Sequence, residues 1–237
     1  HTRSAFVTGV QTCALPIYPD FWNVGTGSAR IDFVAVDETW SGPVNAGFRS
    51  RQRYVDLTGS SARDALNEEW EVLVYRVGQR GQPYFLFDIV ATQQCASNSP
   101  LKLEEYRYGG MGVRGSKEWK DKSNFSFLSS EGKNREQGDA TRARWAHLGG
   151  KVNGALAGIA ILDHPSNFRS PQTMRMNPED PFFNYAPSQM GAFEIKPGEK
   201  LILRYRYLVS DGPPDVAELN RIWNDFANPP RVEVTFR

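Results

Sequence analysis

Residues 158–176 read GIAILDHPSNFRSPQTMRM, and this stretch decides the expected fold. Residues 159–162 form an apolar run of strand length, which ends abruptly in a polar loop interrupted by Pro165 and Pro171. A buried strand that ends in such a loop is a common way for a rigid scaffold to present a functional site. The stretch therefore predicts a β scaffold. Its candidate site residues are Asp163, His164, Asn167, Arg169 and Arg175.

The composition is that of a globular protein. Of the 237 residues, 40% are hydrophobic and 12% aromatic, which is enough to fill the core of one large all-β domain. With 28 basic and 27 acidic side chains the formal net charge is +1, so charge gives no footprint for nucleic acid. No apolar run approaches the roughly 18 residues that a membrane-spanning helix needs, and we expect no membrane span.

The distribution of turn-forming residues from residue 18 onward is typical of a β protein. The chain has 21 glycines and 15 prolines, with short apolar stretches between them. Residues 70–75 and 84–92 predict a pair of neighbouring strands around a turn at 78–81. Residues 84–91 are apolar at nearly every position, which predicts a strand covered on both faces and a buried, hydrogen-bonded Asp88. Further strands are predicted at 44–57, 101–108, 142–148, 152–162, 192–195, 200–209 and 231–236, with a surface excursion at 119–140. Turns are predicted at 149–151, where two glycines join neighbouring strands, and at 196–199, where Pro and Gly occupy turn positions.

One helix is predicted near the C-terminus, because Val216, Leu219, Ile222, Trp223 and Phe226 recur at helical spacing. Together these elements predict an all-β fold, a two-sheet antiparallel sandwich of the jelly-roll or galactose-mutarotase-like type with one short C-terminal helix. We expect a single domain over residues 18–237.

The first residues have a different interpretation. Residues 7–17 read VTGVQTCALPI, which is the translation of a common short-read sequencing adapter. We therefore interpret residues 1–17 as an adapter-derived segment fused to an N-terminally truncated metagenomic gene, and expect them to pack poorly. Without Cys13, Cys95 stands alone, so the remaining chain can form no internal disulfide. Cellular location cannot be read from such a chain.

Residues 109–115, GGMGVRG, resemble a phosphate-binding loop only superficially, because the Gly-Lys-Ser/Thr ending is missing. A tight bend is the better interpretation, and it would place Tyr108 and Arg114 at the mouth of the sandwich. Arginine suits bidentate contact with a carboxylate or a sugar diol. Pairing of Arg114 with a structural aspartate is an equally open alternative.

Trp145 and His147 lie two residues apart, so they share one face of a strand. An aromatic ring beside polar groups can grip the apolar face of a sugar, although Trp145 also suits a core position. No metal site is predicted, because HExxH and CxxC spacings are absent and the neighbouring residues Asp163 and His164 could bind one ion only if the loop bends there. The cofactor, if the protein uses one, is not identified by the sequence. Carboxylates considered for acid or base work are Glu104, Glu105, Asp163 and Glu194.

Several of these motifs together resemble a bacterial family of unknown function known as PmoA-like or methane oxygenase PmoA. The resemblance spans nearly all of residues 18–237. It rests on DFW at 20–22, YRYGGMGVRG at 106–115, RW at 144–145, LDHPSN at 162–167, and PGE at 197–199 followed by RYR at 204–206.

The resemblance implies a soluble or exported β-sandwich protein with a carbohydrate-related role, for which a periplasmic location would be compatible. Methane oxidation is not implied, because the authentic subunit is embedded in the membrane and the mean hydropathy here is -0.51. Members of that family carry a His-His-Arg segment just before Asp-Phe-Trp, where this chain has the adapter-like peptide.

Our leading hypothesis is a carbohydrate-active enzyme of hydrolase, lyase or epimerase type, with a cleft between the Gly-Gly bend and the Asp-His-Pro loop. His164 or Asp163 would act as general acid or base, and Arg114 would hold an anionic or diol group. Substrate-binding residues would be Tyr108, Trp145, His147, Asn167, Arg169 and Arg175. The alternative is a non-catalytic carbohydrate-binding module, and a structural protein comes third. Catalysis predicts two converging titratable groups in a pocket, whereas a binding module predicts an aromatic platform.

Overall fold

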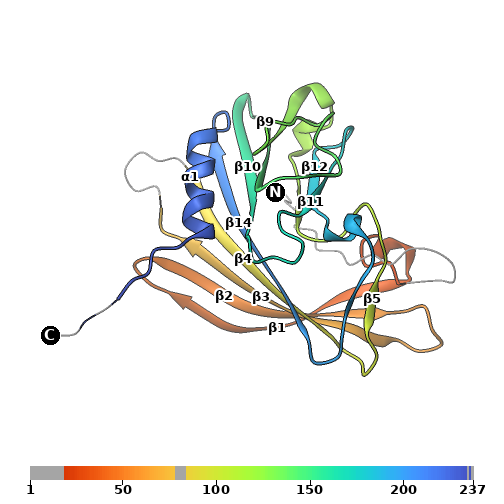
Figure 1. The fold of residues 1–237 in the computed structure, drawn as a ribbon. Coiled ribbons are helices and arrows are strands. Elements are labelled where there is room, and N and C mark those ends of the chain that lie inside the picture. The colour runs from red at the N-terminus through yellow and green to blue at the C-terminus, as the bar shows by residue number, and fades with distance from the viewer. Residues whose placement is uncertain (1–18, 78–83, 234, 236–237) are drawn as a thin grey trace.

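The computed structural model describes residues 19–77, 84–233 and 235 (Figure 1). The expectations for residues 1–17 and for the turn at 78–81 lie outside the described residues.

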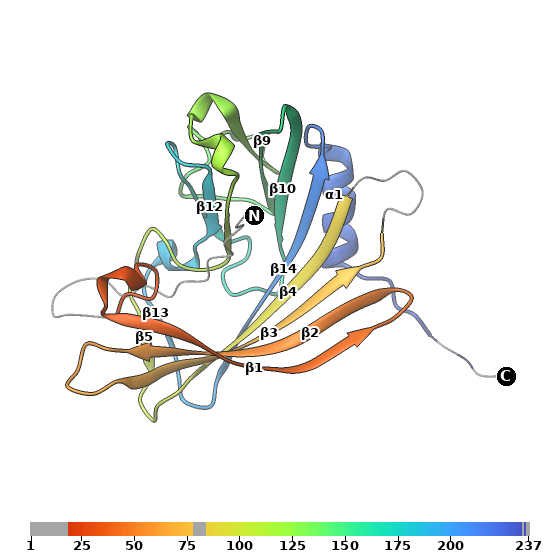
Figure 2. The same ribbon diagram turned by 180° about the vertical axis from the view of Figure 1, so that it is seen from behind.

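The largest element is an antiparallel sheet of eight strands in the order β1-β2-β3-β4-β14-β10-β9-β7. Its strands are β1 (Ala29–Ser41), β2 (Asn45–Asp56), β3 (Arg63–Tyr75), β4 (Tyr84–Cys95), β14 (Lys200–Asp211), β10 (Ala155–Asp163), β9 (Trp145–Val152) and β7 (Phe125–Ser129). Figures 1 and 2 show β1, β2 and β3 extending away from α1 (Val216–Ala227) and from a smaller sheet, with one end beside β5 (Leu101–Leu103). We call β1–β3 the wing.

A second sheet of four strands, in the order β6-β12-β11-β8, packs on one face of the large sheet. Its strands are β6 (Gly112–Arg114), β12 (Phe182–Tyr185), β11 (Thr173–Met176) and β8 (Thr141–Arg142). A two-stranded sheet pairs β13 (Phe193–Ile195) with β5 (Leu101–Leu103). Short 3-10 helices are η1 (Val24–Thr26), η2 (Lys117–Trp119), η3 (Lys122–Asn124) and η4 (Pro187–Met190). The predicted all-β sandwich is confirmed.

The two sheets enclose the main core. Ile161 and Tyr205 of the large sheet meet Met174 and Tyr185 of the small sheet, and all four are fully buried. Alternate residues of the same strands point the other way, so Leu162 instead packs in a second cluster beneath α1 (Val216–Ala227). The small sheet and α1 therefore lie on opposite sides of β10 and β14 (Figure 1).

The predicted C-terminal helix is confirmed as α1. It begins after Asp215, whose side chain accepts a hydrogen bond from the backbone N–H of Glu218 and caps the first turn. It buries Leu219, Ile222 and Phe226 against the sheet. Each such side chain contributes about 1.5–3 kcal/mol of hydrophobic stabilisation, so packing rather than helix propensity fixes α1 in place.

The predicted strand pair 70–75 and 84–92 is also confirmed, with Trp70 opposite Ala91. Asp88 is buried, as expected, and is satisfied by Arg206, whose Nε lies 2.7 Å from Oδ1. The Tyr75 hydroxyl donates to the other carboxylate oxygen at 2.7 Å. Burial and the neighbouring Asp88 carboxylate raise the pKa of Tyr75 to about 12. Asp88 and Arg206 therefore form a structural ion pair across β4 and β14, on the side of the sheet that faces α1.

Two expectations between residues 119 and 163 were wrong. The excursion at 119–140 contains β7, whose Phe125 and Phe127 are buried and which pairs with β9. The predicted turn at 149–151 lies inside β9, and the chain turns instead at Asn153 and Gly154, both of which have positive φ. Gly150 is required for packing rather than turning, because a Cβ there would lie 2.2 Å from the Asn124 carbonyl oxygen.

Other differences are smaller. The strand predicted at 101–108 ends at Leu103, and the described residues 231–233 form no strand, while Val234 and Phe236 lie outside the described residues. The turn at 196–199 is confirmed by the hydrogen bond from Glu199 N–H to the Lys196 carbonyl. β1 was not predicted at all.

Candidate functional site

The structure distributes the predicted site residues over separate places. Asp163, Asn167 and Arg169 hold the loop that follows β10, while Trp145, His147 and His164 lie on the side of the large sheet that faces α1. Tyr108, Arg114 and Arg175 meet on the outer face of the small sheet. No hydrogen bond, ion pair or ring contact among the described residues joins Arg114 to Asp163 or His164.

Asp163 is buried, with 1% of its surface exposed, and it organises its own loop. Its carboxylate accepts hydrogen bonds from Asn167 Nδ2 at 2.7 Å, from Ser170 Oγ at 2.7 Å and from the Gln172 backbone N–H at 3.0 Å. Burial raises the pKa of Asp163 to about 6, against the opposing effect of these donors. The donors fix both oxygens, so the geometry favours a positioning role over proton transfer.

Asn167 and Arg169 connect the same loop to its surroundings. Asn167 pairs with the backbone of Arg204, donating to its carbonyl at 2.7 Å and accepting from its N–H at 2.7 Å. Arg169 has a positive φ of 63°, and its guanidinium donates to the carbonyls of Pro187, Gly191 and Ala192. The Arg169 side chain therefore binds backbone carbonyls, and the Asn167 side chain binds the Arg204 backbone together with the Asp163 carboxylate.

The Gly-Gly bend (residues 109–115) and the Asp-His-Pro loop (residues 163–169) both contact η4. Arg169 donates to Pro187 in η4, and the Ser188 hydroxyl of the same turn bonds the Tyr108 carbonyl at 2.7 Å. Gly110 passes close to the chain here, because a Cβ on it would lie 2.2 Å from the Tyr185 carbonyl oxygen. The bend and the loop therefore lie at one end of the sandwich, but η4 lies between the side chains of the bend and those of the loop.

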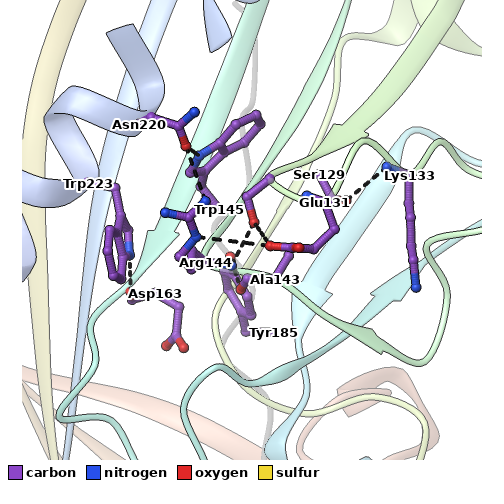
Figure 3. Close-up of polar contacts among 11 residues, drawn as sticks. Ser129, Glu131, Lys133, Ala143, Arg144, Trp145, Asp163, Tyr185, Asn220 and Trp223 are labelled. Atoms are coloured by element: carbon purple, nitrogen blue, oxygen red, sulfur yellow. Dashed lines mark hydrogen bonds and ion pairs between the residues drawn. The ribbon is translucent and has the colours of Figure 1, made fainter. Parts of the chain in front are cut away.

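On the other side of the sheet, His164 and Trp145 serve the packing of α1. The His164 ring contacts Phe226 edge-on at 4.8 Å and exchanges a hydrogen bond with Ser166. Burial and the positive charge of Arg204 lower the pKa of His164. Trp145 is fully buried and donates to Asn220 of α1 at 3.0 Å, and Trp223 of α1 donates to the Asp163 backbone carbonyl (Figure 3).

His147 is buried among glycines. Its ring lies where Cβ atoms of Gly149 and Gly158 would lie, and neither ring nitrogen has a hydrogen-bond partner among the described residues. Burial lowers the pKa of His147 to about 4, so the imidazole is neutral near pH 7. Contact of His147 with a ligand stays a prediction that this burial does not favour.

Tyr108, Arg114 and Arg175 form a connected group around Phe182. The Arg114 guanidinium lies over the Phe182 ring at 4.9 Å, and the Tyr108 ring lies 6.1 Å from that ring. Arg175 lies over Tyr108 at 5.6 Å. Strand alternation explains the grouping, since Arg114 and Phe182 are opposite one another on β6 and β12 and both point away from the core.

Trp22 completes this group and was missed as a site residue, although it belongs to the Asp-Phe-Trp motif. Its ring stacks on Tyr108 at 5.3 Å with an interplanar angle of 11°, and contacts Phe182 at 5.4 Å. Asp20 fixes the turn by accepting from the Trp22 N–H. We call the whole set the aromatic–arginine cluster: Trp22, Tyr106, Arg107, Tyr108, Arg114, Arg175 and Phe182.

Two unsatisfied polar atoms lie beside this cluster. Asn184 stands opposite Arg175 on the neighbouring strand. The Asn184 Oδ1 acceptor and the Arg175 Nε donor are both buried and lack a hydrogen-bond partner among the described residues. Buried polar groups usually find partners, so these two atoms are exceptions within the described part of the chain.

Glu68 is a second residue that sequence reasoning missed. It is buried and accepts hydrogen bonds from Gln52 at 3.0 Å, Tyr54 at 2.8 Å and Gln93 at 2.7 Å, and burial raises its pKa. It lines a cavity of about 40 Å³ together with Gly109 and other residues of the Gly-Gly bend. The sequence did contain a sign of this burial, because Glu68 alternates with Leu66 and Trp70 and so falls on the inward face of β3.

The described residues contain no group of three His, Cys, Asp or Glu side chains placed to hold a metal ion. Within the same residues, no helix has the length and apolarity that crossing a membrane would need.

An antiparallel β-sandwich with a cluster of aromatic rings and arginines on the outer side of its small sheet defines the class of this protein. The chain belongs to a family of unknown function (DUF6807), whose model matches residues 4–224. The description of that family does not refer to PmoA or to methane oxidation. No curated protein and no solved structure matches the chain.

Proposed function

We propose that this protein binds carbohydrate at the aromatic–arginine cluster. The observation that carries the proposal is the Trp22–Tyr108 stack beside Arg114 and Arg175. Aromatic rings pack against the apolar faces of sugar rings, and guanidinium groups donate paired hydrogen bonds to their oxygens. Tyr108, Arg114 and Arg175 would contact the ligand.

Binding without catalysis is the better supported form of this function. The carboxylate that contacts the cluster is that of Asp139, whose Oδ2 lies 2.6 Å from Arg175 Nη1. The Asp163 carboxylate is occupied by its own loop, and His164 faces α1. Two free titratable groups therefore do not converge on the cluster within the described part of the chain. Asp163, Asn167 and Arg169 would act as positioning residues.

A carbohydrate-active enzyme is the second candidate, and Glu68 is the observation that favours it. A carboxyl group whose pKa is raised by burial is suited to general acid or base work. Its cavity of about 40 Å³ would admit only a substituent of a sugar ring, not the whole ring. Release of reducing ends, or a change in sugar configuration, that disappears in Glu68→Gln would favour this candidate.

The binding proposal is tested by calorimetric titration of oligosaccharide panels into the protein and into Trp22→Ala. Trp22→Ala should weaken binding about tenfold, equivalent to about 1.4 kcal/mol, because it removes one ring of the stack. Trp40→Ala is the matched control, since Trp40 is also a half-buried tryptophan but lies in the wing beside Arg49. Equal affinities for the parent protein and Trp22→Ala would contradict the proposal.

A further inference from the structure

We infer that the ligand of the aromatic–arginine cluster is an acidic carbohydrate, one that carries carboxylate groups, such as an oligomer of uronic acid. This inference rests on the proposed function and narrows it to a substrate class.

The first support is the placement of arginines on the small sheet. Inward residues of this sheet, such as Met174 and Phe183, belong to the core. By strand alternation, Arg114, Arg175 and Arg142 all fall on the opposite face, where they are paired with Phe182, Asn184 and Thr173. Arg114 and Arg175 are separated by two strand spacings and by two residues along the strands, or about 12 Å. The face therefore presents a row of guanidinium groups.

The second support is that few described carboxylates compensate these arginines. Of Arg107, Arg114, Arg142 and Arg175, only Arg175 forms an ion pair with a described residue, and its partner is Asp139. The contrast with the wing is informative, because Arg49, Arg51 and Arg53 there each face one or two carboxylates.

The chain as a whole has nearly equal numbers of acidic and basic side chains, 27 and 28. The positive charge on the outer face of the small sheet is thus local. A row of arginines of which only Arg175 has a carboxylate partner among the described residues is complementary to an anionic ligand.

The third support is the way the guanidinium groups are held. Arg114 lies over Phe182 at 4.9 Å, and Arg107 lies over Tyr108 at 5.0 Å. A guanidinium that rests on a ring keeps its N–H groups at its edges, where they match the two oxygens of a carboxylate. The Trp22–Tyr108 stack beside them supplies the surface that a sugar ring requires, which a site for a bare anion would not need.

The test compares three ligands of equal length by calorimetry: an oligogalacturonide, its fully methyl-esterified form, and a sulfated neutral oligosaccharide. Esterification removes the charge and keeps the sugar rings. We expect the oligogalacturonide to bind at least tenfold more tightly than its ester, and to weaken as salt is raised from 50 to 300 mM.

The outcomes separate the two proposals. Equal affinity for acid and ester would overturn the acidic-ligand inference and leave carbohydrate binding in place. Preference for the sulfated ligand over the uronate would also overturn the carboxylate assignment. Binding of none of the ligands, nor of any member of the oligosaccharide panels, would overturn the proposed function itself.

Arg114→Gln and Arg142→Gln are the diagnostic variants, because both arginines are exposed and their replacement leaves the core intact. Each should lower the affinity for the oligogalacturonide by about tenfold and abolish most of the preference over the ester. Arg51→Gln is the matched control, an exposed arginine of the wing whose partner is Asp37. An unchanged acid-to-ester ratio in both diagnostic variants would overturn the inference.

Discussion

At the scale of single residues, the structure explains glycines that the sequence left ambiguous. Gly149 and Gly150 were interpreted as a turn, which is the usual meaning of such a pair. In the structure they lie within β9, and a Cβ on Gly158 of β10 would lie 2.1 Å from His147 Nε2. Close approach of a side chain cannot be read from one strand alone, because the atoms that forbid a Cβ come from elsewhere in the chain.

His147 should make the protein sensitive to acid. Its folded-state pKa is about 4 and its ordinary value 6.5, so below pH 6.5 the unfolded chain takes up a proton that the folded protein refuses. This stability is present above pH 6.5 and is lost as pH falls toward 4, by about 3 kcal/mol in total. His147→Leu should remove that slope, as measured by denaturant unfolding at pH 7 and pH 4.5.

Asp163 acts in the opposite direction and must be considered in the same experiment. Its folded pKa of about 6 exceeds its ordinary value of 3.8, so the folded protein binds the extra proton and gains stability as pH falls through this range. The parent and His147→Leu share this contribution, which cancels in their difference. Identical pH slopes for the two proteins would contradict the role given to His147.

Arg169 should stabilise the loop after β10. Its guanidinium donates to three carbonyls, and Arg169→Ala would leave them unsatisfied, at a cost of about 2 kcal/mol in the free energy of unfolding. Because φ is 63°, Arg169→Gly should be less destabilising than Arg169→Ala by about 1 kcal/mol. Chemical denaturation of both variants measures the difference, and a more stable alanine variant would contradict the assigned backbone conformation.

At the scale of elements, the sequence predicted those helices and strands whose residue pattern is visible within the element itself. The helix followed from its spacing, and the β3–β4 pair from the apolar run of β4. β1 was not predicted, because bulges between Phe33 and Ala35 and between Val36 and Glu38 interrupt the two-residue alternation of side chains that marks a strand. β7 escaped because it is short and lies in a polar stretch, and only its pairing with β9 makes it a strand. Partners distant in sequence give no local signal.

The Asp88–Arg206 pair, which faces α1 from the sheet, should behave as a buried ion pair. Arg206→Met would leave the Asp88 carboxylate without its cation and should cost about 3 kcal/mol. Asp88→Asn combined with Arg206→Met should recover most of that loss, because no uncompensated charge remains. A double-mutant cycle by denaturant unfolding measures the coupling, and strictly additive losses would contradict it.

At the scale of the whole molecule, the sequence predicted a sandwich but not the assembly of its site. Tyr108, Arg114 and Arg175 were each nominated, yet they meet only because the small sheet turns its outer face toward Trp22. Nothing in the spacing of these residues shows which sheet covers which face. For the same reason Asp163 and His164 were expected to share a pocket with them, whereas one sits in a loop network and the other under α1.

The wing gives the molecule two contrasting surfaces. One face carries the ion pairs of Arg49, Arg51 and Arg53. By the strand register, the other face carries Phe33, Val36 and Phe48, of which Phe33 is 69% exposed and Val36 is 50% exposed. Such an apolar surface is the kind that hydrophobic dyes bind.

The folded protein should therefore enhance the fluorescence of an apolar dye, and Phe33→Ser should reduce that signal by at least half. The side chain is mostly exposed, so the free energy of unfolding should change by no more than about 0.5 kcal/mol. Val232→Ser is the matched control, because Val232 is 76% exposed but lies near the C-terminus, away from the wing. Equal dye binding by Phe33→Ser and the parent protein would show that the wing face does not offer the continuous apolar surface that the strand register implies.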